Sequence, residues 1–186
     1  MSQITKQALA YALKDTLKVK PFNKITISDI TTQCGINRMT FYYHFQDIYD
    51  LLEYAIISEF DKVLNGNKTV STWKQGMKNI LTSTLENKSF ILNAYHSLGK
   101  DKIENYLSKV VFDLTYSVVN EESKGMSVYE DDKVFIAKFY EYALIGIVLD
   151  WVKSNMNEEP DIILERIDKV LSGETKTALN RFRFDK

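Results

Sequence analysis

The segment from Thr26 to Phe45 constrains the fold more than any other part of the chain, because it has the pattern of two short helices joined by one tight turn. Ser28 is placed to cap the first helix, and Asn37 is placed to cap the second. Gly35 lies between them, where a helix ends in the left-handed conformation that glycine adopts without steric cost. The pattern is typical of a helix-turn-helix motif.

The two helices of this segment are expected over 29–34 and 38–44, and each must bury an apolar face. The first helix and the turn supply inward candidates in Ile27, Ile30, Cys34 and Ile36. The second helix supplies Phe41 and Phe45. Its opposite face then carries Asn37, Arg38, Thr40, Tyr42, Tyr43 and His44.

This outward face carries hydrogen-bond donors and aromatic rings, and it has no carboxylate. A carboxylate would be repelled by DNA, which carries a phosphate charge about every 1.7 Å along its axis. Arg38 can fork onto a guanine edge, and Thr40 and Tyr43 can touch base edges or thymine methyl groups. Tyr42, Thr40 and His44 can donate to phosphates. An ordinary amphipathic surface helix would explain the periodicity alone, but the turn, the caps and the acid-free face together favour DNA binding.

The charge of the chain is divided unevenly between its two parts. Residues 1–46 carry six basic and two acidic side chains, a net charge of +4, whereas the whole chain has a net charge of −1. A basic N-terminal part in an otherwise acidic chain predicts a polyanionic partner for that part alone.

The segment 35–52, GINRMTFYYHFQDIYDLL, resembles the signature of the TetR/AcrR family of bacterial transcriptional regulators. Members of that family carry a glycine turn, a recognition helix with a Thr-x-Tyr-x-x-Phe core and a leucine-rich fourth helix. The matching positions align without a gap and are Gly35, Thr40, Tyr42, Phe45, Leu51 and Leu52. The resemblance implies that the outward residues of the second helix contact DNA.

The resemblance also implies phosphate contacts near Lys24 and Thr26, just ahead of the first helix of the motif. Met39 replaces a commonly small residue and is expected to pack on a thymine methyl group. Many family members carry a lysine near the start of the fourth helix, where this chain has Ile48. That phosphate contact is therefore not carried over, although the N-terminus of the helix can still face a phosphate.

The rest of the chain has helical periodicity and few helix breakers, with 2 prolines and 7 glycines among 186 residues. A first helix is expected before Pro21, over 5–18. Later helices are expected over 47–64, 71–85, 89–98, 101–120, 131–155 and 160–171. The clearest break is Asn65-Gly66-Asn67, and the polar, basic tail after Gly173 is expected to be frayed.

These elements predict an all-α, TetR-like fold. Residues 1–46 would form a three-helix helix-turn-helix domain, and residues 47–186 a larger helical domain for dimerisation and effector binding. The helix over 47–64 would connect the two domains.

The segment 134–152, VFIAKFYEYALIGIVLDWV, is apolar on most of its circumference and needs cover on several sides. One buried helix at the centre of a monomer would satisfy this pattern. The family resemblance favours a homodimer instead, built as a four-helix bundle from this helix and the last long one. The interface candidates are Ile145, Val148, Leu149, Ile163, Ile167 and Val170. Gly146 would allow a partner helix to approach closely.

A sensing role would place an apolar or aromatic small-molecule effector among the middle helices. The candidate lining residues are Trp73, Phe90, Tyr95, Phe112, Tyr116 and Tyr140. Aromatic residues at helical spacing more often form plain core than a pocket.

Several other classes of protein are disfavoured. No apolar run approaches the roughly 20 residues of a membrane span, and the first residues lack the pattern of an export signal. The single cysteine, Cys34, excludes an internal disulfide and fits the cytoplasm. Two histidines without partners at ligand or catalytic spacing predict no metal site, no cofactor and no enzymatic activity.

The sequence therefore predicts a DNA-binding regulator that recognises a palindromic operator as a homodimer. The leading hypothesis is a repressor that a small molecule releases from DNA. An activator, or a regulator that works with a protein co-regulator, is an alternative, because the C-terminal half resembles regulators of dihydroxyacetone kinase operons. A helical binding protein that has lost DNA binding is a further alternative, because Ile48 replaces the usual lysine.

Overall fold

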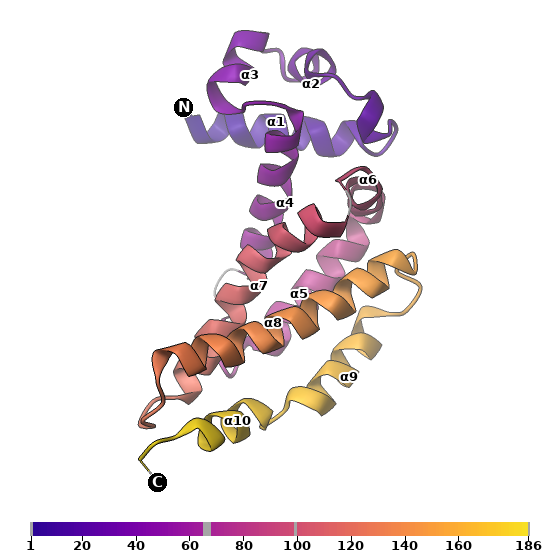
Figure 1. Cartoon of the computed structure of the whole chain (residues 1–186). Helices are drawn as coiled ribbons and strands as arrows, with labels where there is room; N and C mark the ends of the chain where they lie inside the picture. Colours follow the sequence, from indigo (N-terminus) through magenta and orange to yellow (C-terminus); the bar gives the residue numbers. More distant parts are fainter. Residues whose placement is uncertain (1, 65–67, 99, 186) are drawn as a thin grey trace. The chain divides into compact units, whose positions relative to one another are not determined.

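The computed structural model describes residues 2–64, 68–98 and 100–185, and every regular element in these ranges is a helix (Figure 1). The all-α class expected from the sequence is confirmed for this part of the chain. In chain order the elements are α1 (Ser2–Thr16), the short 3-10 helix η1 (Phe22–Lys24), α2 (Ile27–Cys34), α3 (Arg38–His44), α4 (Ile48–Leu64), α5 (Trp73–Glu86), α6 (Lys88–Leu98), α7 (Lys100–Glu122), α8 (Glu130–Lys153), α9 (Pro160–Leu171) and α10 (Glu174–Phe182).

Most helices begin and end within a few residues of the predicted bounds. Helix α3 and helix α9 coincide with the predicted ranges 38–44 and 160–171. Pro160 lies in the first turn of α9, where its missing N–H has no intrahelical partner to lose. The predicted break at Asn65-Gly66-Asn67 lies outside the described residues.

The expectation of a frayed tail after Gly173 is wrong, because α10 occupies this segment. Gly173 has a left-handed backbone with φ of 80°, which lets the chain turn from α9 into α10. Leu179 is fully buried and anchors the helix. A single buried leucine among polar and basic neighbours is too weak a pattern to be recognised in the sequence.

The chain packs into two compact units, which are described separately. The first unit comprises Met1–Phe60 and Asn87–Tyr106. It therefore contains α1 to α3, most of α4, α6 and the start of α7. The domain boundary after residue 46 stays a prediction.

A close-packed core holds the helix-turn-helix in the first unit. Leu9, Leu13 and Leu17 follow one another at helical spacing along α1 and its C-terminal end, and all three are fully buried. Helix α1 packs on α2 and α3, which contribute the fully buried Ile30 and Phe41. This shared core fixes the orientation of α2 relative to α3.

Helix α6 belongs to the same unit, and polar contacts connect it with α1. The side-chain amide of Asn93 donates a hydrogen bond to the carbonyl oxygen of Leu17, with a distance of 3.0 Å. Lys14 Nζ lies 5.6 Å from the ring centroid of Phe90 and 2.8 Å from Glu59 Oε2 on α4. Helix α1 is therefore in contact with two helices from outside the predicted domain 1–46.

The second unit comprises Asp61–Glu86 and Leu107–Lys186. Figure 1 shows α9 and α10 following one another alongside α8, and α5 packs against α9. One core cluster joins the end of α7 to α8 and α10 through Val119, Val128, Ile136, Ala137, Tyr140 and Leu179. Helix α8 is the central element of this unit, because its buried residues extend from Ile136 to Val152.

Candidate nucleic-acid interface and ligand cavity

The turn between α2 and α3 has the geometry that the sequence predicted. Gly35 ends α2 in the left-handed conformation, with φ of 66°, and its N–H donates back to the carbonyl oxygens of Thr31 and Thr32. Asn37 caps α3, because its Oδ1 accepts from the backbone N–H of Thr40 at 2.8 Å and from the Thr40 hydroxyl at 3.0 Å. The start of α3 is therefore fixed by a cap on its first turn.

The cap of α2 is Thr26, and the prediction of Ser28 is wrong. Thr26 Oγ1 accepts from the backbone N–H of Asp29, and the Thr26 N–H and hydroxyl both donate to Asp29 Oδ2. This reciprocal capping box has a recognisable sequence signature, a threonine followed three residues later by an acid. Lys20 Nζ lies 2.6 Å from the same carboxylate oxygen. The hydrogen bonds from Lys20 and Thr26 lower the pKa of Asp29 from 3.8 to about 2.

The two faces of α3 separate as the sequence predicted. Phe41 has no exposed surface and Phe45 is 3% exposed, and their ring centroids lie 5.9 Å apart. Met39 and Tyr43 are 78% and 83% exposed. These side chains are therefore free to contact another molecule.

The remaining residues of this face are also on the surface. Asn37, Arg38 and Tyr42 are exposed, and Thr40 and His44 are half-buried. Arg38 Nη2 lies 3.4 Å from the hydroxyl oxygen of Tyr42, which leaves its other N–H groups available. The structure thus places all seven predicted DNA-contact residues between Asn37 and His44 at the surface around α3. Phe41, which was predicted to face inward, is buried.

Lys24 and Thr26 lie just before α2 and are both exposed. The donors of Thr26 are already used by Asp29, so Thr26 has no free N–H or hydroxyl hydrogen to offer a phosphate. A phosphate contact from Lys24 stays a prediction.

The predicted dimer interface needs correction, because five of its six residues lie in the core of the chain itself. The buried residues are Ile145, Val148, Leu149, Ile163 and Ile167, and each is at most 6% exposed. Only Val170, at 69%, is exposed. Helix α8 is apolar almost all round, so its sequence could not indicate which face the chain covers.

Another face of α8 remains uncovered by the chain. Phe135, Phe139 and Tyr142 are each at least 60% exposed, and Ile147 is 41% exposed. The spacing of Phe135, Phe139 and Tyr142 places them on one side of the helix together with Gly146, whereas Ile147 lies on a different side. A Cβ atom added to Gly146 would meet nothing within 4 Å. We call the residues Phe135, Phe139, Tyr142 and Gly146 the α8 stripe.

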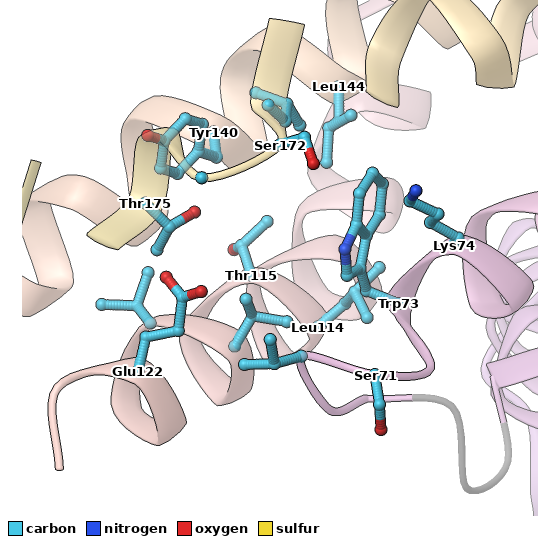
Figure 2. A pocket seen from close by; sticks show the side chains of 15 residues that line it. Ser71, Trp73, Lys74, Leu114, Thr115, Glu122, Tyr140, Leu144, Ser172 and Thr175 are labelled. Atoms are coloured by element: carbon cyan, nitrogen blue, oxygen red, sulfur yellow. The ribbon is translucent and has the colours of Figure 1, made fainter. Parts of the chain in front are cut away.

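A cavity of about 360 Å³ lies in the second unit, between the start of α5, the end of α7, α8 and the α9–α10 connection. Figure 2 shows Trp73 on one side of it and Tyr140 and Thr175 on the other. Its lining residues are Val70, Ser71, Trp73, Lys74, Leu114, Thr115, Val118, Val119, Glu122, Tyr140, Leu144, Leu171, Ser172, Gly173 and Thr175. The cavity therefore combines apolar walls with hydroxyls, the carboxylate of Glu122 and the ammonium group of Lys74.

The structure brings together only two of the six predicted pocket residues, Trp73 and Tyr140. Phe112 and Tyr116 stack on each other and pack against the core cluster of the second unit. Phe90 and Tyr95 belong to the first unit. Glu122 and Thr175 could not be recognised from the sequence, because neither belongs to an apolar or aromatic pattern.

Among the described residues, no group of three or more histidine, cysteine, aspartate or glutamate side chains is arranged to hold a metal ion. Within the same part of the chain, no helix combines the length and the apolarity that a membrane crossing requires.

Comparisons with known proteins agree with this architecture. Residues 12–55 match the family model described as "Bacterial regulatory proteins, tetR family", and residues 71–173 match the model "Transcriptional regulator C-terminal region". A relative from Lactococcus lactis subsp. lactis (strain IL1403), the HTH-type dhaKLM operon transcriptional activator DhaS, is 29% identical over 153 residues, covering 78% of each chain.

Two solved structures share the fold. The dihydroxyacetone kinase operon activator DhaS superposes with a TM-score of 0.72 at 21% identity, covering 97% of this chain and 98% of the other. NalD, the secondary repressor of the MexAB-OprM multidrug efflux pump in Pseudomonas aeruginosa, superposes with a TM-score of 0.51 at 13% identity over the full length of both chains. With its helix-turn-helix and its C-terminal helical region both matched, the chain belongs to the TetR family of transcriptional regulators.

Proposed function

We propose that this regulator binds a palindromic operator in the cytoplasm as a homodimer and reads it with α3. The observation that carries the proposal is the exposed, carboxylate-free face of α3, which the Gly35 turn and the Asn37 cap hold on a buried core. Arg38, Met39 and Tyr43 are the base-reading candidates, and Lys24, Tyr42 and His44 are the phosphate-contact candidates.

The homodimer forms through the α8 stripe and the exposed Val170 of α9. An exposed row of aromatic side chains on a long helix is unfavourable in water, and a second copy covers it without any additional partner. A two-fold dimer presents two equivalent α3 helices, and this symmetry accounts for a palindromic operator.

The effector of the leading hypothesis is a small molecule that occupies the cavity of the second unit and releases a repressor from DNA. The alternative is an activator, and one observation favours it: the 29% identical relative is named as a transcriptional activator of an operon. The two signs of regulation use the same DNA-binding surface, so the test of DNA binding does not depend on them.

Fluorescence anisotropy with the DNA upstream of the chain's own gene tests the proposal. We expect a complex whose affinity falls steeply with salt, because lysine and arginine contacts to phosphate release counterions. Lys24→Ala should reduce the slope of log K against log salt by about one. The absence of any salt-sensitive complex would instead support a helical binding protein that has lost DNA binding.

A further inference from the structure

We propose that the cavity of the second unit binds a small organic cation with an apolar body, and that the carboxylate of Glu122 is its counter-ion. This inference names the chemical class of the effector, and it rests on the proposed function only for its regulatory consequence.

The carboxylate of Glu122 is the group that selects the charge of the ligand. Its Oε2 atom is buried and has no hydrogen-bond partner among the described residues. Figure 2 shows the carboxylate turned from the end of α7 toward Thr115 and Thr175. A buried oxygen without a donor carries an unfavourable desolvation cost, so a donor that arrives with a ligand is bound favourably.

The charges around the cavity leave this carboxylate only partly compensated. Lys74 is the basic residue of the lining, but its Nζ lies 2.6 Å from Asp168 Oδ2 and is neutralised there. Burial raises the pKa of Glu122, Lys176 lowers it and Glu121 raises it again. A cation beside Glu122 would offset the desolvation cost of this carboxylate and the repulsion from Glu121, whereas an anion would add to the repulsion.

A second lining residue offers an acceptor rather than a donor. The hydroxyl of Thr115 donates to the carbonyl oxygens of Val111 and Phe112, with distances of 3.2 and 3.1 Å. Its lone pairs are then what it can present to the cavity. Glu122 and Thr115 therefore both present acceptors, and an ammonium group has three N–H donors and no acceptor.

The remaining walls select an apolar body of limited size. Trp73, Leu114 and Leu144 line the cavity, and an aromatic ring also attracts a cation through its face. The volume of about 360 Å³ lies near the lower end of the range for ligand pockets, roughly 300–1,000 Å³. A ligand with a single ring and a short amine arm fits this combination.

Calorimetric titration of the full chain with three probes that share a 2-phenylethyl body tests the inference. The probes are 2-phenylethylamine, 2-phenylethanol and 3-phenylpropionate, which are cationic, neutral and anionic at neutral pH. We expect the amine to bind at least about tenfold more tightly than the other two, as a charge-assisted hydrogen bond predicts. Equal binding of the three probes, or binding of none of them at millimolar concentration, would overturn the inference.

Substitutions then locate the site. Glu122→Gln keeps the size of the side chain and should abolish the preference for the amine, whereas the exposed Glu86→Gln should leave it unchanged. Trp73→Leu should weaken the binding of all three probes. This variant locates the site independently if Glu122→Gln fails to fold. A preference for the amine that survives in Glu122→Gln would contradict the assigned counter-ion.

Operator binding by the same proteins separates this inference from the proposed function. Glu122→Gln should bind DNA as the parent does, because the substitution does not touch α3. If the parent binds DNA and shows no preference for the amine, only the ligand class is wrong. If the parent binds no DNA, the proposed function fails, whatever the calorimetry shows.

Discussion

At the scale of single residues, the polar side chains of the helix-turn-helix divide into those that hold the motif and those that face outward. The side chain of Asn37 holds the first turn of α3, and that of Thr26 holds the first turn of α2. Asn37 Oδ1 and the N–H and hydroxyl of Thr26 are already used inside the chain. We therefore propose that base reading falls mainly to Arg38, Met39 and Tyr43, whose side chains are exposed.

The first prediction concerns these outward residues. Arg38→Ala and Tyr43→Ala should each weaken operator binding by about 1–3 kcal/mol and relax the preference at particular base pairs. Tyr11→Ala is the matched control, because Tyr11 is also a highly exposed tyrosine of the first unit but lies on α1. Anisotropy titrations against single-base operator variants measure both effects. An equal loss in all three variants would contradict base reading by α3.

A second prediction concerns the role of Thr26. Thr26→Ala should lower the free energy of unfolding by about 1 kcal/mol, because it removes the cap of α2, whereas Thr26→Ser should keep most of the stability. Urea unfolding followed by circular dichroism measures the difference. A Thr26→Ala variant with unchanged stability and weakened DNA binding would show that Thr26 contacts phosphate instead.

The acid dependence of the same cap gives a third prediction. Because the folded-state pKa of Asp29 is depressed from 3.8 to about 2, its stabilising contribution is fully present above pH 3.8. That contribution is lost as the pH falls from 3.8 toward about 2, since the protonated carboxyl no longer accepts from Lys20 and Thr26. NMR titration of the Asp29 side-chain carboxyl measures the pKa, and Lys20→Ala should raise it. A pKa of 3.8 in the parent would contradict the capping box.

At the scale of elements, α8 has two apolar faces with different tasks. One face, which includes Ile145, is buried in the second unit, and the other face is the exposed α8 stripe. A charge introduced on either face is unfavourable, but for different reasons. On the buried face it is stranded in the core of the chain, and on the stripe it is stranded only when a partner covers it.

The fourth prediction separates these two faces. Phe139→Asp should leave the chain folded and weaken the dimer by tenfold or more, because an ion would be buried against the partner. Ile145→Asp should instead unfold the second unit. Val19→Asp is the control, since Val19 is 87% exposed and lies in the first unit. Sedimentation at micromolar concentration with circular dichroism distinguishes the outcomes. A Phe139→Asp protein that sediments as the parent dimer does would exclude the stripe as the interface.

The sequence was sufficient to predict those helices whose apolar periodicity agrees with their capping and turn residues. Helix α3 was predicted with its bounds, because Gly35, Asn37 and the two buried aromatics Phe41 and Phe45 all indicate the same helix. The sequence was insufficient where one signal stood alone. Leu179 could not reveal α10, and Ser28 competed with Thr26 as a cap because both residue types favour that position.

Which helix faces are buried in the second unit, and which residues line its cavity, depend on the packing between helices. The apolar periodicity of a single helix does not indicate this packing. In α8 nearly every position is apolar, so Ile145 and Phe139 look alike in the sequence although one is buried and the other exposed. The cavity includes Glu122 because the ends of α7 and α9 come together in the fold. No local pattern around Glu122 indicates that meeting.

At the scale of the whole molecule, regulation requires that a ligand and an operator affect each other. Thermodynamic linkage makes the effect reciprocal, so an inducing ligand and the operator each weaken the binding of the other by the same factor. If the chain is a repressor that the ligand releases, the ligand should weaken operator binding. If it is an activator that the ligand switches on, the ligand should strengthen operator binding. Both hypotheses need the dimer to hold two α3 helices at a fixed separation.

The central claim is that a two-fold dimer reads DNA with α3 from each copy. Selection of bound sequences from a random duplex pool, followed by sequencing, tests it most directly. We predict an enriched palindrome whose half-sites lie about one helical turn apart, near 34 Å, or a multiple of that distance. The enrichment should be reduced in Arg38→Ala and in Phe139→Asp. Recovery of no enriched sequence, or of a single site without two-fold symmetry, would contradict the account.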